Sequence, residues 1–283
     1  MKHQLNSINP HAAQPTSLLA LGVSLIKHRQ LILRMIRREV IGRYKGSVIG
    51  LAWSFFNPIF MLAVYTIVFS MIFKARWGVD GEESRVQFAL ILFAGMVVLN
   101  FFIEVLNRAP NLILSNINYV KKVVFPLEIL SVISIGTALF HALINFFVLF
   151  AACFIFHGYL NLTVLLIPIV IFPLIILSLG FSWILASLGV FVRDAGQTIG
   201  LLTTLLMFLS PVFYPVSAVP ERLQPYIMIN PMTFIIEQVR LVVMWGKLPN
   251  WVGLGIYLTI AILLMLVGFT WFQKTRKGFA DVI

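Results

Sequence analysis

Six stretches of the sequence are long enough and apolar enough to cross a lipid bilayer. A membrane-spanning helix needs about 20 consecutive, mainly apolar residues, because the hydrocarbon core is about 30 Å thick. Inside that core each backbone N–H and C=O group needs a partner within the protein, and a helix supplies one for every residue. The sequence therefore predicts an all-α integral membrane protein with six transmembrane helices, at residues 51–73, 86–106, 126–156, 160–192, 196–219 and 248–272.

Composition and charge support this fold class. Of the 283 residues, 60% are hydrophobic and 11% are charged, whereas a soluble domain has about 45–50% apolar and about 25% charged residues. The net charge of +11 would indicate a nucleic-acid partner in a soluble protein. This chain has no room for a soluble basic domain, so we expect no nucleic-acid partner. The basic residues are interpreted as topology signals and anchors to anionic membrane lipid.

The basic residues also predict an orientation. Lysines and arginines concentrate before the first span, between the second and third spans, and after the sixth. Because such residues are retained on the cytoplasmic side, both termini are predicted to be cytoplasmic.

The segment 25–45 that precedes the first span has a helical pattern of its own. Apolar residues such as Ile32 and Ile36 fall on one side, and basic residues such as Arg34 and Arg38 on the other, although Arg43 intrudes on the apolar side. The pattern predicts an amphipathic helix in the membrane interface after a polar tail at residues 1–24. A solvated cytoplasmic helix is the alternative.

Three glycines spaced by four follow this helix. Gly42, Gly46 and Gly50 are expected to form the bend and the close-packed face where it meets the first span, or else a flexible linker.

The connection between the fifth and sixth spans is unusual. It is too apolar for an aqueous loop, and Pro220, Pro225 and Pro231 interrupt it. A pair of short helices that re-enter the outer leaflet fits this pattern. Glu237 and Arg240 lie three residues apart there, so they share one helix face. Mutual pairing is the default interpretation, and lining a polar path is the functional one.

Two cytoplasmic connections carry candidate contact residues. Pro110 is suited to the first turn of a short helix, and Lys121 and Lys122 mark the inner surface. This segment is either a plain connector or a helix presented to a cytoplasmic partner. Arg193 and Asp194, between the fourth and fifth spans, either cap helices, pair across a subunit boundary, or merely separate two helices.

Several classes of site are missing from the sequence. No GxxxxGK[ST] phosphate-binding loop occurs, so the chain cannot bind ATP by that route. The histidines have no metal-ligand spacing, and no catalytic group is proposed. Cys153 lies in an apolar run and is expected to be a small buried side chain. Any energy source must therefore come from a partner.

Four motifs in order resemble the membrane subunits of ABC-type exporters of cell-surface polysaccharides, the permeases of O-antigen, capsule and teichoic acid. They are "VIGRYKGSVIGLAWSFFNPIFMLAVYTIVFSMIF", "NYVKKVVFPLEIL", "GVFVRDAGQTIGLLTTLLMFLSPVFYP" and "INPMTFIIEQVR". The resemblance runs from about residue 35 to the C-terminus. It implies a transport subunit of the bacterial inner membrane rather than an enzyme. It also implies a homodimer on two cytoplasmic ATPase subunits, which bind ATP and Mg and drive export of an undecaprenyl-pyrophosphate-linked polysaccharide.

The resemblance also implies roles for particular residues. The residues expected to couple the chain to its ATPase are Asn111, Leu112, Asn116, Asn118, Tyr119, Lys121 and Lys122. Those expected at the substrate entrance, where an anionic head group arrives, are Arg37, Arg38, Arg43, Tyr44, Lys45 and Trp53. Aromatic candidates for the glycan path, where rings pack on sugars, are Phe55, Phe56, Phe208, Phe213 and Tyr214. Arg193 and Asp194 match an inner-loop charge pair, and Glu237 and Arg240 fall in the outer gate.

Three other functions stay open on the sequence. An ABC exporter of drugs or small lipids would share the architecture, and a deletion that spares the surface glycan would indicate it. A membrane-embedded glycolipid enzyme requires catalytic carboxylates or histidines, of which the spans offer few. A self-sufficient channel would conduct ions alone in liposomes.

Overall fold

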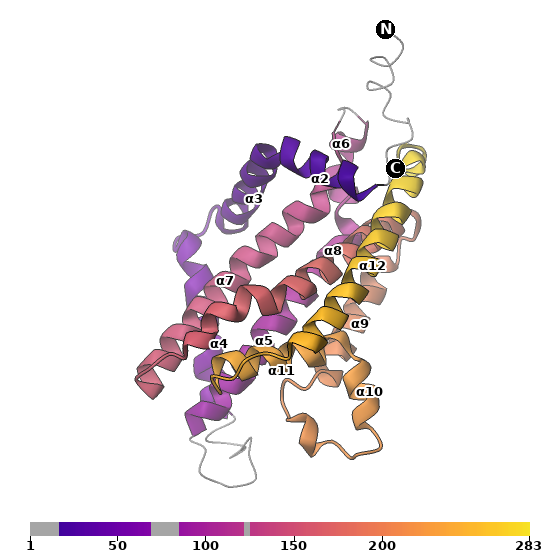
Figure 1. Ribbon diagram of the computed structural model, residues 1–283. Helices are drawn as coiled ribbons and strands as arrows, with labels where there is room; N and C mark the ends of the chain where they lie inside the picture. Colours follow the sequence, from indigo (N-terminus) through magenta and orange to yellow (C-terminus); the bar gives the residue numbers. More distant parts are fainter. Residues whose placement is uncertain (1–16, 69–84, 122–124) are drawn as a thin grey trace.

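The computed structural model describes residues 17–68, 85–121 and 125–283, and all regular structure within these ranges is helical (Figure 1). Among these described residues, five helical segments are long and apolar enough to cross a membrane. They contain α4 (Trp53–Ile67), α5 (Arg85–Arg108), α7 (Ile129–His157), α8 (Ile167–Phe191) and α12 (Trp251–Thr275). The end of the expected first span, residues 69–73, lies outside the described residues.

The predicted fifth span is shorter than expected. Instead of residues 196–219, the helix α9 covers Ala195–Leu209 and has 15 residues. Ser210 is extended because the ring of the following Pro211 disfavours a helical conformation in the residue before it. At about 1.5 Å per residue, α9 is about 22 Å long, which is less than the thickness of the hydrocarbon core.

The segment after α9 forms two short helices, as the prolines predict. These are α10 (Gln224–Ile229) and α11 (Pro231–Val243), which follow the 3₁₀ turn η6 (Val216–Ala218). Pro225 and Pro231 each occupy a first turn, where no backbone N–H is needed. Asn230 caps α11 by accepting a hydrogen bond from Met232 N.

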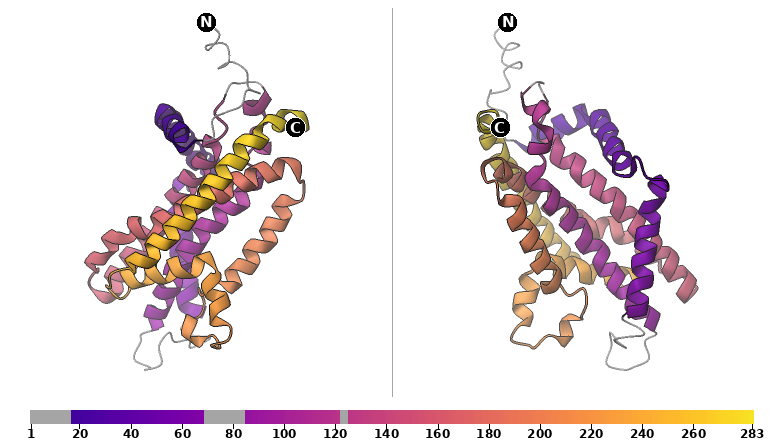
Figure 2. Two further views of the ribbon diagram at one scale, coloured as in Figure 1. Left: turned by 45° about the vertical axis from the view of Figure 1, so that its right-hand side comes forward. Right: turned by 180° about the vertical axis from the view of Figure 1, so that it is seen from behind.

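Helix α5 is the central helix of the molecule. It packs against α4, α7, α8, α9 and α11, and it is the most buried of the five candidate spans (Figure 2). Helix α4 lies at the periphery and has the least buried window of the five. The surface between α4 and α5 is therefore formed by α5, which is packed against several other helices, and by α4, which is largely exposed.

Two glycines set the close approach of α8 and α12. A Cβ atom on Gly268 would lie 2.3 Å from the carbonyl oxygen of Gly180, and a Cβ on Gly180 would lie 2.8 Å from Met265 N. Small residues at such crossings allow helix backbones to touch. Trp183, which is fully buried, packs on Phe269 next to this crossing.

The N-terminal segment differs from the expected division into a tail and one helix. The predicted helix 25–45 is divided into α2 (Leu18–Lys27) and α3 (Arg29–Tyr44), which meet at His28, and α2 takes in the end of the predicted tail 1–24. Residues 1–16 of that tail lie outside the described residues. Helix α2 begins early because Ser17 caps it by accepting from Ala20 N. Helix α3 packs on α7, where Gly136 leaves room for the side chain of Ile36.

The expected role of the glycines between α3 and α4 is only partly correct. Gly46 and Gly50 have φ angles of 89° and 57°, so they make the bend in the left-handed region. A Cβ atom on Gly42, Gly46 or Gly50 would meet no other atom within 4 Å. Close packing on these glycines was therefore a wrong expectation for the described residues.

In its described part, the connection between α5 and α7 consists of short helical turns. They are η3 (Ala109–Asn111), η4 (Leu114–Asn116) and α6 (Ile117–Lys121). The turn η3 rests on α8, where a Cβ on Gly189 would lie 2.0 Å from Pro110 O.

The start of α7 is tied to both ends of the chain. Glu128 accepts hydrogen bonds from Ser24 Oγ at 2.9 Å and from Arg276 Nη1 at 3.0 Å. Arg276 lies in the turn η7 (Arg276–Gly278) before the last helix, α13 (Phe279–Val282). Helix α2 and the C-terminus therefore lie at the same end of the molecule (Figure 1).

Candidate functional site

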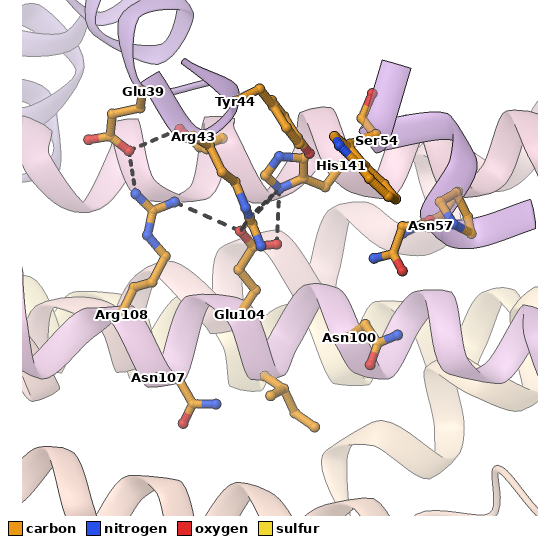
Figure 3. A pocket seen from close by; sticks show the side chains of 15 residues that line it. Glu39, Arg43, Tyr44, Ser54, Asn57, Asn100, Glu104, Asn107, Arg108 and His141 are labelled. Carbon is orange, nitrogen blue, oxygen red and sulfur yellow. Dashed lines mark hydrogen bonds and ion pairs between the residues drawn. The ribbon is translucent and has the colours of Figure 1, made fainter. Parts of the chain in front are cut away.

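A hollow of the described part of the chain, called here the main cavity, lies between α3, α4, α5 and α7. It has a volume of about 780 Å³, within the range of about 300–1,000 Å³ that ligand sites occupy. Its lining is unusually polar for a position among apolar helices (Figure 3). The lining residues are Glu39, Arg43, Tyr44, Trp53, Ser54, Asn57, Pro58, Asn100, Ile103, Glu104, Asn107, Arg108, Thr137, His141 and Asn145.

Five ionisable side chains that line this cavity form one network. Arg43 donates to Glu104 at 2.7 Å, and Arg108 pairs with Glu39 and lies 3.9 Å from Glu104. His141 Nδ1 lies 3.0 Å from Glu104 Oε1 (Figure 3). The two arginines and two glutamates carry balancing charges, so the network is an internal neutral cluster. Ionisable groups at membrane depth are usually paired in this way.

The position of Arg43 explains its intrusion on the apolar side of α3. The side chain turns from the buried face of α3 toward Glu104 of α5 rather than toward lipid. Beside it, burial raises the pKa of the Tyr44 phenol, and the positive charge of Arg43 offsets only part of that effect. Tyr44 therefore stays protonated at neutral pH and presents a neutral hydroxyl to the cavity.

Other lining residues had no role in the sequence analysis. Thr137, His141 and Asn145 recur every four residues along α7, which places them on one face of that helix. Asn100 and Glu104 repeat the same spacing on α5. Polar residues at this helical spacing within otherwise apolar spans are the signal that could have predicted the cavity.

The structure separates the six residues expected at the substrate entrance. Arg43, Tyr44 and Trp53 line the cavity. Arg37 and Lys45 are exposed outside it. Arg38 lies in a different hollow, of about 490 Å³, between α3 and the inner connection.

The aromatic candidates for the glycan path do not line the main cavity. Phe55 and Phe56 are exposed on α4, and Phe55 makes an edge contact with Phe147 of α7. Phe208 is exposed at the end of α9, and Tyr214 donates a hydrogen bond to its carbonyl oxygen. Phe213 lies half-buried in the loop between them.

The residues expected to face an ATPase have mixed environments. Asn111, Asn118 and Lys121 are exposed, whereas Leu112 is buried and packs inside the protein. Asn116 donates to the carbonyl oxygen of Leu112, which fixes the turn. Lys122 lies outside the described residues.

Tyr119 is held against the inner connection by two contacts. Its ring stacks on Phe125 with centroids 4.4 Å apart, and its hydroxyl accepts from Arg38 at 3.3 Å. Tyr119 therefore links helix α3 to the connection between α5 and α7.

The charge pair between α8 and α9 is exposed. Asp194 holds the N-cap position of α9 without a side-chain cap bond, and neither it nor Arg193 makes an ion pair within the described residues.

The expected pairing of Glu237 with Arg240 is present. Arg240 Nη1 donates to Glu237 Oε1 at 2.8 Å, and the arginine side chain is completely buried. Its guanidinium also donates to carbonyl oxygens of Pro211 and Val212, at 2.7 Å and 2.9 Å. Gly95 of α5 leaves space for this group, because a Cβ there would lie 2.8 Å from Nη2.

Comparison with known proteins adds a family to this geometry. Over 261 residues the chain is 24% identical to the O-antigen export system permease protein RfbA of Myxococcus xanthus, covering 92% of this chain and 97% of that one. It is 25% identical over 254 residues to the O-antigen export system permease protein RfbA of Klebsiella pneumoniae, covering 89% and 95%. It is 22% identical over 248 residues to the polysialic acid transport protein KpsM of Escherichia coli, covering 85% and 92%. Residues 30–244 match the ABC-2 type transporter family, and the chain belongs to it.

Proposed function

We propose that this chain is the permease subunit of an ATP-driven exporter that moves a lipid-linked polysaccharide, O-antigen foremost, from the cytoplasm to the periplasm. The observation that carries the proposal is the similarity, over nearly the whole chain, to permease proteins of O-antigen export systems. The polar cavity among apolar helices supports it, because a hydrophilic cargo needs such a surface at membrane depth. ATP and Mg are bound by a separate ATPase.

The proposed topology has six spans in the bacterial inner membrane, with α9 as the fifth. Both termini are cytoplasmic, which agrees with the position of α2 and the C-terminus at one end of the molecule. Helices α2 and α3 lie in the inner interface, and α10 and α11 re-enter the membrane from the outer side. The buried Arg240 supports the re-entry of α10 and α11, since its guanidinium donates to the Pro211 and Val212 carbonyl oxygens just beyond the end of α9.

The proposed assembly is a homodimer on two ATPase subunits. Exposed apolar side chains on α4 and α9, such as Phe60 and Leu201, form faces suited to a second copy or to lipid. The ATPase docks at the exposed part of the inner connection, with Asn118 and Lys121, and near Arg193 and Asp194.

The substrate reaches the protein from the inner leaflet. Its pyrophosphate meets the exposed Arg37, Arg38 and Lys45 of the interfacial segment. Arg43 is a weaker candidate for this contact, because Glu104 already neutralises it. The aromatic residues of α4 and of the segment after α9 flank the path of the glycan.

Deletion of the gene tests the proposal. Surface polysaccharide should disappear, accumulate inside the cell as a lipid-linked form, and return with the wild-type gene, and the tagged chain should co-purify with an ATPase. Loss of resistance to a drug with an unchanged surface glycan would instead identify a drug exporter. Co-purification without any ATPase would contradict the proposal.

A further inference from the structure

Three asparagine side chains from three helices share one hollow. Asn57 lies on α4, Asn100 on α5 and Asn145 on α7, and each lines the main cavity and also a smaller hollow of about 80 Å³ beside it. None of the three amides has a hydrogen-bond partner in the described part of the chain. Figure 3 shows Asn57 and Asn100 on opposite sides of the space between α4 and α5.

Lipid cannot be what fills this space. Each amide offers two N–H donors and a carbonyl acceptor, and hydrocarbon pairs with neither. An unpaired amide in a hydrocarbon environment is strongly unfavourable, and polar side chains in spans face water or a polar ligand instead. Asn57 and Asn100 are exposed, so their amides are open to whatever occupies the hollow.

The chemistry of the cavity changes along its length. At the cytoplasmic end the arginines and glutamates neutralise one another. The amides follow, and beyond them the smaller hollow is lined by uncharged residues, among them Tyr65, Phe93 and Met96. A cavity without free charge does not favour an anion. It suits a neutral molecule with many hydroxyl groups and apolar C–H faces, because amides bind hydroxyls and rings pack on C–H faces.

We propose that Asn57, Asn100 and Asn145 form a binding subsite for uncharged sugar residues of the transported glycan. The amides exchange hydrogen bonds with successive hydroxyl groups as the chain moves, and Tyr65 and Phe93 contact the apolar faces of the sugars. The lipid-linked pyrophosphate binds elsewhere, on exposed basic residues. This inference rests on the proposed function, because it requires a glycan as cargo.

Thiol labelling tests whether the subsite is open to water. In a Cys153→Ala background, Asn145→Cys is compared with Leu143→Cys, which lies two residues away on α7, is exposed and does not line the cavity. A small water-soluble methanethiosulfonate should modify Asn145→Cys at least about tenfold faster than Leu143→Cys. The cysteine thiolate attacks the reagent's sulfenyl sulfur and expels methanesulfinate, and this thiolate forms in water and not in lipid. Equal rates in inverted membrane vesicles would overturn the proposal.

Protection of the same thiol tests the occupant. Two kinds of vesicle are prepared. The first come from cells that make the glycan and carry a hydrolysis-deficient ATPase. The second come from cells that lack the glycosyltransferase that adds the first sugar to the lipid primer. Labelling of Asn145→Cys should be several-fold slower in the first vesicles. Equal rates would show that the hollow holds water alone, which would overturn the sugar subsite.

Export by substituted chains separates this inference from the proposed function. The double variant Asn100→Leu, Asn145→Leu should export several-fold less glycan, whereas Asn100→Ser, Asn145→Ser should retain most of it. Thr259→Val removes a polar group from α12 away from the cavity and should export normally. Thermal unfolding of the purified variants controls for misfolding. Normal export by a folded Leu variant overturns only the subsite, and surface glycan that survives gene deletion overturns the proposed function.

Discussion

The guanidinium of Arg240 on α11 donates a 3.1 Å hydrogen bond to the carbonyl oxygen of Ile91 in the middle of α5. Together with its bonds to Pro211 and Val212, this contact joins α5, α11 and the segment after α9. One buried cation thus satisfies the Pro211 and Val212 carbonyls, which lie beyond the end of α9, and adds a second hydrogen bond to a carbonyl within α5.

Arg240→Met should destabilise the protein strongly. The substitution keeps much of the side-chain volume but leaves the buried carbonyls of Pro211 and Val212 without this donor, and each buried polar group left unsatisfied costs about 1–3 kcal/mol. The midpoint of thermal unfolding in detergent should fall well below that of the wild type. Arg222→Met, at an exposed arginine, is the matched control and should change little. An unchanged midpoint for Arg240→Met would show that the contacts are not needed.

Gly268→Ala should loosen the packing of α8 against α12. The added methyl group overlaps the Gly180 carbonyl, and overpacking of this kind costs about 1–3 kcal/mol. Gly255→Ala, in the same helix, meets no atom within 4 Å and should be neutral or stabilise by about 0.5–1 kcal/mol. Unfolding midpoints of the two variants give the comparison, and equal midpoints would contradict the close crossing.

Glu104→Gln should lower stability more than Arg43→Gln. Glu104 is the shared partner of Arg43, Arg108 and His141, so its neutralisation leaves Arg43 and His141 without their carboxylate, whereas Arg108 keeps Glu39. The Arg43 side chain is 55% exposed, so water screens its ion pair with Glu104. Removal of this ion pair in Arg43→Gln should lower the free energy of unfolding by about 0–1 kcal/mol. A double-mutant cycle of the two changes measures the coupling. A larger loss from Arg43→Gln would mean that Glu104 does not organise the network.

Lys121→Glu should weaken the proposed docking of the ATPase. The side chain is exposed at the end of α6 and no acidic partner holds it in the described chain, so a reversed charge acts on the partner surface. The ATPase recovered with the tagged permease should fall several-fold while the permease stays inserted. Lys247→Glu, an exposed lysine on the other side of the molecule, should leave recovery unchanged. Full recovery with Lys121→Glu would remove this residue from the docking surface.

The long spans could be predicted because apolar length alone determines them. The end of α9 could also have been predicted, since Pro211 restricts Ser210 locally, yet the apolar run continues past it and hides the break. The helical periodicity of the N-terminal segment shows neither its division at His28 nor the packing of α3 on α7.

The site was only partly predictable for a different reason. Arg43, Tyr44 and Trp53 stand out in sequence by charge or aromatic character. Their cavity partners come from distant helices, and Glu39 and Thr137, which share a hydrogen bond, lie 98 residues apart. Only helix packing brings such residues together. The sequence therefore shows the spacing of these residues along each helix but not which of them lie close together in the fold.

The ion pair between Glu128 and Arg276 has a consequence for biosynthesis. The two residues lie 148 positions apart, so the ribosome completes α7 long before it makes the arginine. Until Arg276 is made, Ser24 is the side-chain partner of this carboxylate that has already been synthesised, and its cation is missing. The last helix therefore acts as the closing step of assembly, and chains truncated before Arg276 should insert their helices yet remain substrates for membrane quality-control proteases.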